Sequence, residues 1–97
     1  RTIYPDGFPG WAVEHGGVLE TSLMLHLHPE LVDMSKVVDH PPATFPPYDF
    51  FPIKPQWTPQ SGCLSSAKPA SASKGKLLFD VCVQGMSQHL ATAFPAV

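Results

Sequence analysis

Four residues with side chains suited to ligand binding and proton transfer fall within a span of ten residues near the start of the sequence. They are Trp11, Glu14, His15 and Glu20, and the pair Gly16–Gly17 separates the histidine from an apolar run. A glycine pair before such a run predicts a helix start, where backbone N–H groups lack partners and the helix dipole is positive. A small polar ligand can be held there, and the dipole favours the neutral imidazole that accepts a proton. The pattern therefore predicts a small-molecule site with acid–base chemistry.

Each of these side chains also has a possible structural role. His15 is the candidate general base, although a histidine before a helix can instead bond a loop carbonyl. Glu14 can orient or charge the adjacent ring, or serve as an acid stabilised by the helix dipole. Glu20, in the expected first turn, can reach back to free N–H groups as in a capping box, or support the site from behind. Trp11 offers a flat apolar wall and an N–H donor, or packs within its loop.

Two helices, separated by a proline-rich segment, are expected to position these residues. Residues 1–16 form a predicted loop that carries the candidate site, because proline and glycine turns punctuate it. Apolar residues around most of the segment 17–28 predict a helix, which Pro29 ends. Residues 33–62 hold most of the chain's 12 prolines together with aromatic side chains, which predicts an ordered extended loop rather than a disordered linker. Apolar residues three and four apart predict a second helix over 70–94.

Composition limits the partners of the chain. Of the 97 residues 14% are charged, below the roughly 25% of typical soluble domains, so we expect other protein to cover much of the surface. A net charge of −2 and the lack of a basic stripe argue against nucleic acid. No apolar run approaches the roughly 20 residues that span a bilayer, so no membrane partner is expected. Cys63 and Cys82 are expected to be reduced thiols in a cytoplasmic protein, and the start at Arg1 suggests a piece of a longer polypeptide.

No set of residues has the spacing of metal ligands. His26 and His28 have the H-x-H spacing that chelates a metal from a strand, but in a helix such residues point about 200° apart. The helical periodicity around them therefore argues against a metal site. Cys63 has no basic neighbour that would activate a thiolate. The sequence predicts no metal ligand within this chain.

The segment 11–25 also resembles a known family. Its order W-x-x-E-H-G-G-x-x-E-T-S-L-M-L is similar to the C-terminal part of creatininase, the metal-dependent creatinine amidohydrolase. The resemblance continues in LVD at 31–33, VVDHPPATFPPYD at 37–49, LSSAK at 64–68 and VCVQG at 81–85. It implies a layered α/β/α fold, in which helices cover a central, largely parallel sheet. Residues 1–97 would then form the C-terminal segment of a single creatininase-like domain, stable when docked to the rest of the subunit.

For function, the resemblance implies hydrolysis of the cyclic amide of creatinine to creatine. His15 would shuttle a proton beside Glu14, and Trp11 would wall the substrate pocket. Ala12 stands where the family has an aspartate that contacts the substrate, and alanine cannot make that contact. A pair of divalent ions, zinc or manganese, would be bound by residues outside this chain. The subunits would assemble into a ring-like homo-hexamer.

Two other interpretations remain open. The chain could be a non-catalytic piece that serves packing or assembly, because position 12 lacks the family's aspartate and the metal ligands are absent. It could also belong to a hydrolase of the same scaffold that acts on another small amide.

Overall fold

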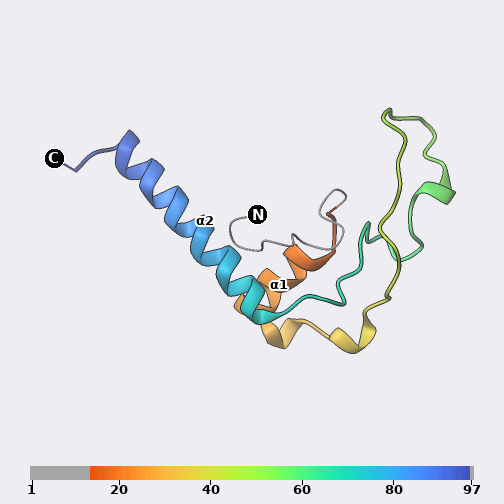
Figure 1. Ribbon diagram of the computed structural model, residues 1–97, viewed down its shortest axis with the longest axis horizontal. Helices are drawn as coiled ribbons and strands as arrows, with labels where there is room; N and C mark the ends of the chain where they lie inside the picture. The colour runs from red at the N-terminus through yellow and green to blue at the C-terminus, as the bar shows by residue number, and fades with distance from the viewer. Residues whose placement is uncertain (1–13, 97) are drawn as a thin grey trace.

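Two α-helices joined by a long irregular segment make up the described part of the chain, residues 14–96, in a computed structural model (Figure 1). In chain order the elements are α1 (Val18–Leu27), the 3₁₀ helices η2 (Pro29–Leu31), η3 (Met34–Lys36) and η4 (Pro55–Trp57), and α2 (Ala72–Ala93). The two α-helices fall where the apolar periodicity predicts them, over 17–28 and 70–94. The proline-rich segment between them is irregular apart from the short 3₁₀ turns.

The boundaries of α1 follow from the residues at its two ends. Gly17 is the N-cap and has no side chain that could accept a bond from the first turn. At the other end the N–H of His28 donates to the carbonyl of Met24 at 2.7 Å, and Pro29 follows. A residue before proline is pushed out of the helical region, so the helix ends there. α1 therefore depends on groups outside itself for the caps at its start.

The two helices cross with their backbones in close contact at Gly75. A β-carbon placed on Gly75 would lie 1.8 Å from the carbonyl oxygen of Ser22 and 2.9 Å from the Cβ of His26. Ser22 is fully buried, and its hydroxyl accepts a hydrogen bond at 3.2 Å from the N–H of Ser71, the N-cap of α2. The glycine at this position is thus required by packing, and α1 also fixes the start of α2.

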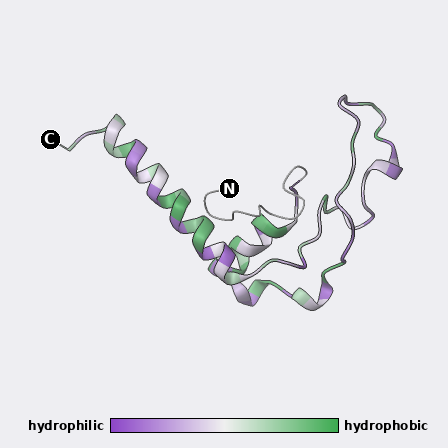
Figure 2. Ribbon diagram, in the orientation of Figure 1, coloured by the Kyte–Doolittle hydropathy of each residue, from purple (hydrophilic) through white to green (hydrophobic). Residues whose placement is uncertain are grey.

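The hydrophobic core of the described residues is small. Its buried apolar members are Val18, Ala67 and Leu78. Beyond the crossing, α2 extends away from the remainder with apolar residues on its surface, and Phe94 near its end is 77% exposed (Figure 2). The radius of gyration is 16.6 Å, larger than the roughly 12–13 Å of a compact domain of this length. Within residues 14–96, apolar side chains of α2 beyond the crossing, such as Met86 and Leu90, are therefore exposed.

The layered α/β/α fold that the resemblance implies has its central sheet in the complete domain, and this chain is expected to supply two helices and a long proline-rich loop. Residues 14–96 contain helices and irregular segments without a strand. A strand needs the backbone of a neighbour for its ladder of hydrogen bonds. Val37 and Val38 form a β-branched run too short for more than the edge of a sheet, and they are followed closely by Pro41 and Pro42, which have no N–H to donate. A second short run of this kind, Ile3 and Tyr4, lies outside the described residues.

The proline-rich loop has a fixed base and a tip that packs on itself. At the base, the N–H of Ala43 donates to the carbonyl of Leu64 at 2.8 Å. At the tip, the rings of Phe50 and Trp57 meet edge to face with centroids 6.3 Å apart. The ammonium of Lys54 lies 4.9 Å and 5.3 Å from the centroids of these two rings. These contacts agree with the expectation of an ordered loop.

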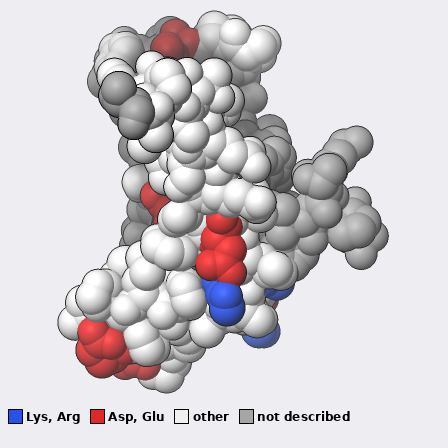
Figure 3. Space-filling model, turned by 90° about the vertical axis from the view of Figure 1, so that its left-hand side faces the viewer, with Lys and Arg blue, Asp and Glu red and all other residues white. Residues whose placement is uncertain are grey.

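Charged side chains are sparse, and most of the surface seen in Figure 3 is uncharged. The ion pairs of Lys76 with Asp80, at 2.5 Å, and of Lys36 with the N-capping Asp33, at 3.8 Å, are exposed. Exposed pairs contribute about 0–1 kcal/mol each, so packing rather than charge holds these elements together. Neither helix of the described region has the length and hydropathy needed to cross a bilayer.

The two glycines of α2 provide a test of the helix crossing. We expect Gly75→Ala to lower the free energy of unfolding, because overpacking costs about 1–3 kcal/mol and exceeds the gain of about 1 kcal/mol in helix propensity. Gly85→Ala is the matched control, since a β-carbon there meets no atom within 4 Å. Urea denaturation followed by circular dichroism measures both. Equal stabilisation by the two substitutions would contradict the close crossing.

Candidate functional site

The carboxylate of Glu14 caps the start of α1. Its Oε1 accepts a hydrogen bond from the N–H of Leu19 at 2.9 Å, and its Oε2 accepts one from the hydroxyl of Ser65 at 3.3 Å. The half-buried side chain thereby supplies the acceptor that the N-cap Gly17 lacks. A negative charge at this end of a helix is also favoured by the dipole. The structural role considered for Glu14, an acid at a helix start, is therefore present.

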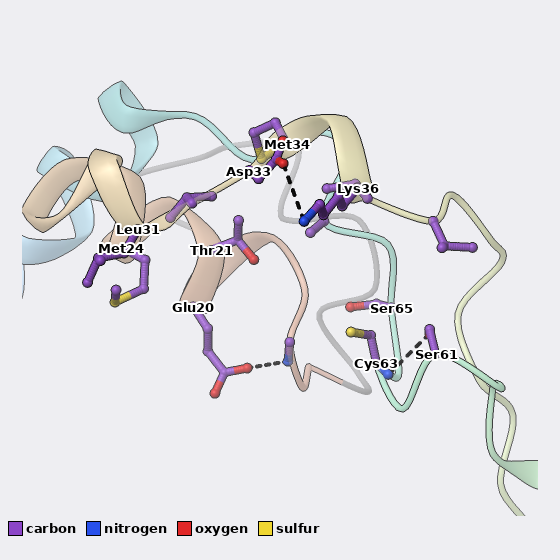
Figure 4. Close-up of a pocket in the computed structure, with 15 residues that line it drawn as sticks. Glu20, Thr21, Met24, Leu31, Asp33, Met34, Lys36, Ser61, Cys63 and Ser65 are labelled. Carbon is purple, nitrogen blue, oxygen red and sulfur yellow. Dashed lines mark hydrogen bonds and ion pairs between the residues drawn. The ribbon is translucent and has the colours of Figure 1, made fainter.

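Glu20 reaches back from the first turn of α1. Its Oε2 accepts a hydrogen bond from the backbone N–H of Gly16, one residue before the N-cap (Figure 4). This contact is the reach-back to a free N–H group, one of the two roles considered for Glu20. Gly16 has a φ of +64°, in the left-handed region that favours glycine, so the chain turns sharply here. The carboxylates of Glu14 and Glu20, one before the turn and one after it, therefore both accept backbone N–H groups at the start of α1.

His15 lies between Glu14 and Gly16, both of which are held by hydrogen bonds. Its carbonyl accepts a hydrogen bond at 2.9 Å from the N–H of Leu64, at the far end of the proline-rich loop. The Glu14 side chain fixes the chain on one side of His15, and the Gly16 N–H fixes it on the other. The histidine itself is exposed. The backbone of His15 is thus tightly held while its imidazole remains accessible to a ligand.

Gly17 allows the segment around residue 65 to approach the start of α1. A β-carbon on Gly17 would lie 2.2 Å from the hydroxyl oxygen of Ser65 and 2.9 Å from both carboxylate oxygens of Glu14. Similarly, a β-carbon on Gly16 would lie 2.9 Å from the sulfur of Cys63. The glycine pair is needed for this close approach as well as for the turn.

A pocket of about 630 Å³ opens beside this turn (Figure 4). Glu20, Ser65 and Cys63 line it near the turn, together with Gly16. Its remaining wall is largely apolar and includes Met24, Leu31, Met34, Val37, Val38 and Ala67. The volume falls within the range of roughly 300–1,000 Å³ typical of small-molecule sites. Of the three candidate residues that the structure describes, Glu14, His15 and Glu20, the last contributes to this wall.

Trp11, the expected wall of the substrate pocket, and Ala12, at the position of the family's substrate-binding aspartate, lie outside the described residues. Their placement beside His15 therefore stays a prediction, as do the catalytic roles of His15 and Glu14. What the geometry establishes is the local support of the turn that follows them.

The described residues do not fit a divalent metal pair. Within residues 14–96, no three His, Cys, Asp or Glu side chains gather in a way that could hold a metal ion. His26 packs on Phe79 with ring centroids 5.6 Å apart, whereas the Nδ1 of His28 lies 3.2 Å from a carboxylate oxygen of Glu30. The H-x-H pair is thus divided between two environments. Cys63 is a free thiol.

Sequence reasoning missed Ser65, the second partner of Glu14. This serine is 1% exposed and lies 51 residues from the glutamate along the chain. Periodicity and motif spacing report only on neighbours along the sequence, so no signal marked the pair.

The adjacent Ser66 makes a similar contact elsewhere, because its hydroxyl donates to Asp39 at 2.6 Å. This hydrogen bond, more than the nearby Lys68 ammonium, lowers the pKa of the exposed Asp39 carboxyl.

The sequence and the structure of this chain match those of known proteins. The family model of creatininase, described as creatinine amidohydrolase, matches residues 7–90. A creatinine amidohydrolase of Pseudomonas putida is 62% identical over 95 residues, which cover 98% of this chain and 36% of that protein. This chain therefore spans little more than a third of the length of this relative.

Solved structures give the same result. A manganese form of creatininase superposes with a TM-score of 0.88 at 61% identity, covering 98% of this chain and 37% of that one. A glutamate-to-glutamine mutant creatininase complexed with creatine matches with the same TM-score, identity and coverage. The same mutant is also known in a form described as Zn-Zn type. The family match over most of the chain, together with these likenesses in sequence and structure, shows that this chain belongs to the creatininase family.

Proposed function

We propose that this chain supplies the proton-transferring part of the active site in a metal-dependent hydrolase that converts creatinine to creatine. The observation that carries the proposal is the fixed turn at His15, with its backbone held by Leu64 and its neighbours held by Glu20 and Leu19. An exposed imidazole on a rigid backbone at the start of a helix is suited to general acid–base catalysis. The relative of Pseudomonas putida, named creatinine amidohydrolase, supports this choice of reaction.

The reaction needs two proton movements at the ring amide. Water adds to the carbonyl carbon and loses a proton, and the carbon–nitrogen bond of the ring then breaks as the leaving nitrogen gains one. A single imidazole can accept the first proton and deliver it to the nitrogen. His15 would perform both steps, while Glu14 and Glu20 hold the turn that carries it. Trp11 would form the wall of the substrate pocket.

The metal ions of such an enzyme would be held elsewhere in the subunit, because the described residues offer no suitable cluster. Relatives described as manganese and Zn-Zn types indicate the kind of ion. When bound, a divalent pair supplies an activated water and polarises the amide carbonyl. The chain's own residues would orient the substrate and move the proton.

We also propose that the chain functions within a larger cytoplasmic assembly, a homo-hexamer of complete subunits. The apolar surface of α2 supports a large contact with other protein, since exposed apolar patches of this kind mark interaction surfaces. The same surface, together with Ala12, favours the second candidate function, a segment that serves assembly without catalysis.

The first test of the catalytic role is His15→Ala in a complete subunit, built by placing this chain in the matching segment of the Pseudomonas putida enzyme. We expect kcat for creatinine to fall about a hundredfold or more with little change in KM, as for a lost proton shuttle. His28→Ala, an exposed histidine at the end of α1, is the control and keeps kcat. Full kcat in His15→Ala would favour the assembly role.

Position 12 provides a separate test of the substrate site. We expect Ala12→Asp in the same complete subunit to lower KM for creatinine roughly tenfold or more, because a charge-assisted hydrogen bond contributes about 1.5–3 kcal/mol. Ala12→Asn is the matched control, similar in shape but neutral, and should give a smaller gain. Steady-state kinetics measure both. An unchanged KM in Ala12→Asp would show that position 12 does not face this substrate and would favour another small amide.

Metal titration tests the division of labour between this chain and the rest of the subunit. We expect calorimetry with zinc or manganese to show no stoichiometric binding by the 97-residue chain and clear binding by the complete subunit. Tight one-to-one binding by the chain alone would place metal ligands within it and contradict the proposal.

A further inference from the structure

Ser65 connects the segment that follows the proline-rich loop to the turn at His15, through a hydrogen bond to Glu14. Its hydroxyl donates to Glu14 Oε2 at 3.3 Å, and the other oxygen of the same carboxylate takes the N–H of Leu19 at 2.9 Å. The serine is 1% exposed, and it fits only because Gly17 has no β-carbon. A buried hydroxyl directed at a carboxylate costs desolvation unless the bond forms, so the contact restricts where the Glu14 carboxylate can lie.

The residue before Ser65 acts on the next backbone unit of the same turn. The N–H of Leu64 donates to the carbonyl of His15 at 2.9 Å, and the carbonyl of Leu64 accepts from Ala43 at 2.8 Å. Residues 64–65 therefore contact two consecutive residues of the turn, one through the backbone and one through a side chain. Two such contacts fix both the position and the direction of the chain at His15.

We propose that Ser65 is a positioning residue for His15: by holding the Glu14 carboxylate against the start of α1, it sets the direction in which the imidazole leaves the turn. The proposal rests on the proposed catalytic role of His15. Ser65 itself does not touch the substrate in this scheme, and its effect passes through Glu14. Small errors in the placement of a proton-transfer group are costly, since a displacement of about 1 Å can reduce rates about a hundredfold.

Ser66 provides a matched control. It is the next residue, it is also a serine, and its hydroxyl also donates to a carboxylate, that of Asp39 at 2.6 Å. Asp39 belongs to the base of the proline-rich loop and not to the turn at His15. Ser65→Ala and Ser66→Ala therefore both remove a serine hydroxyl that bonds a carboxylate. The difference in kcat between the two variants isolates the effect on the turn at His15.

The experiment compares Ser65→Ala, Ser66→Ala, Glu14→Gln and the double variant of Ser65 and Glu14 in the complete subunit described above. We expect Ser65→Ala to lower kcat about tenfold while KM changes less than about threefold. Ser66→Ala keeps kcat. If Ser65 acts through Glu14, adding Ser65→Ala to Glu14→Gln should cost less than about twofold, because the two residues then form one unit. Ser65→Cys, close in size with a weaker donor, carries the comparison if the alanine variant does not fold.

Three results would overturn the inference. They are equal kcat in the Ser65 and Ser66 variants, a loss on Ser65→Ala that is undiminished in the Glu14→Gln background, and a loss confined to KM. A failure of the proposed function looks different, because His15→Ala then keeps its activity or the complete subunit has none. In that case hydrogen exchange at the Leu19 amide tests whether Ser65 holds the Glu14 carboxylate. Ser65→Ala should accelerate the exchange severalfold and Ser66→Ala should not. Equal exchange rates in the two variants would refute the inference.

Discussion

The position of α1 depends on two close approaches that leave no room for a β-carbon. At Gly75 the backbone of α2 meets the backbone of α1 at Ser22, and at Gly17 the buried Ser65 reaches the start of the same helix. Contacts of this kind act over very short distances and therefore specify position sharply. They explain how a helix with so small a hydrophobic core, in which Val18 is its one buried apolar residue, still has a defined place in the described structure.

The acids near the candidate site mainly support the backbone. Glu14 and Glu20 both accept hydrogen bonds from backbone N–H groups around the start of α1, where the dipole stabilises negative charge. Both carboxylates are engaged in this way, whereas the side chain of His15 between them is exposed. If His15 transfers protons as proposed, the groups that hold the turn are separate from the group that reacts.

Interactions between sequence neighbours could be predicted, and those between distant residues could not. The helices are evident from apolar spacing, and the contact of Glu20 with Gly16 follows from the rule that a first-turn acid reaches back along the chain. The hydrogen bond from Ser65 to Glu14 joins residues 51 apart and corresponds to no local pattern in the sequence. A sheet is likewise not defined by one segment alone, because strands are defined by their neighbours, and within residues 14–96 no neighbour pairs with Val37.

The proline-rich loop has a consequence for how the family can vary. Its base is closed by the bond between Ala43 and Leu64, while its tip is held by its own cluster of Phe50, Lys54 and Trp57. Lengthening a closed loop costs little, about 0.6 kcal/mol for each doubling, so an insertion at the tip can leave the bond at the base intact. The tip is therefore a region in which insertions can accumulate at little cost to the stability of the rest of the chain.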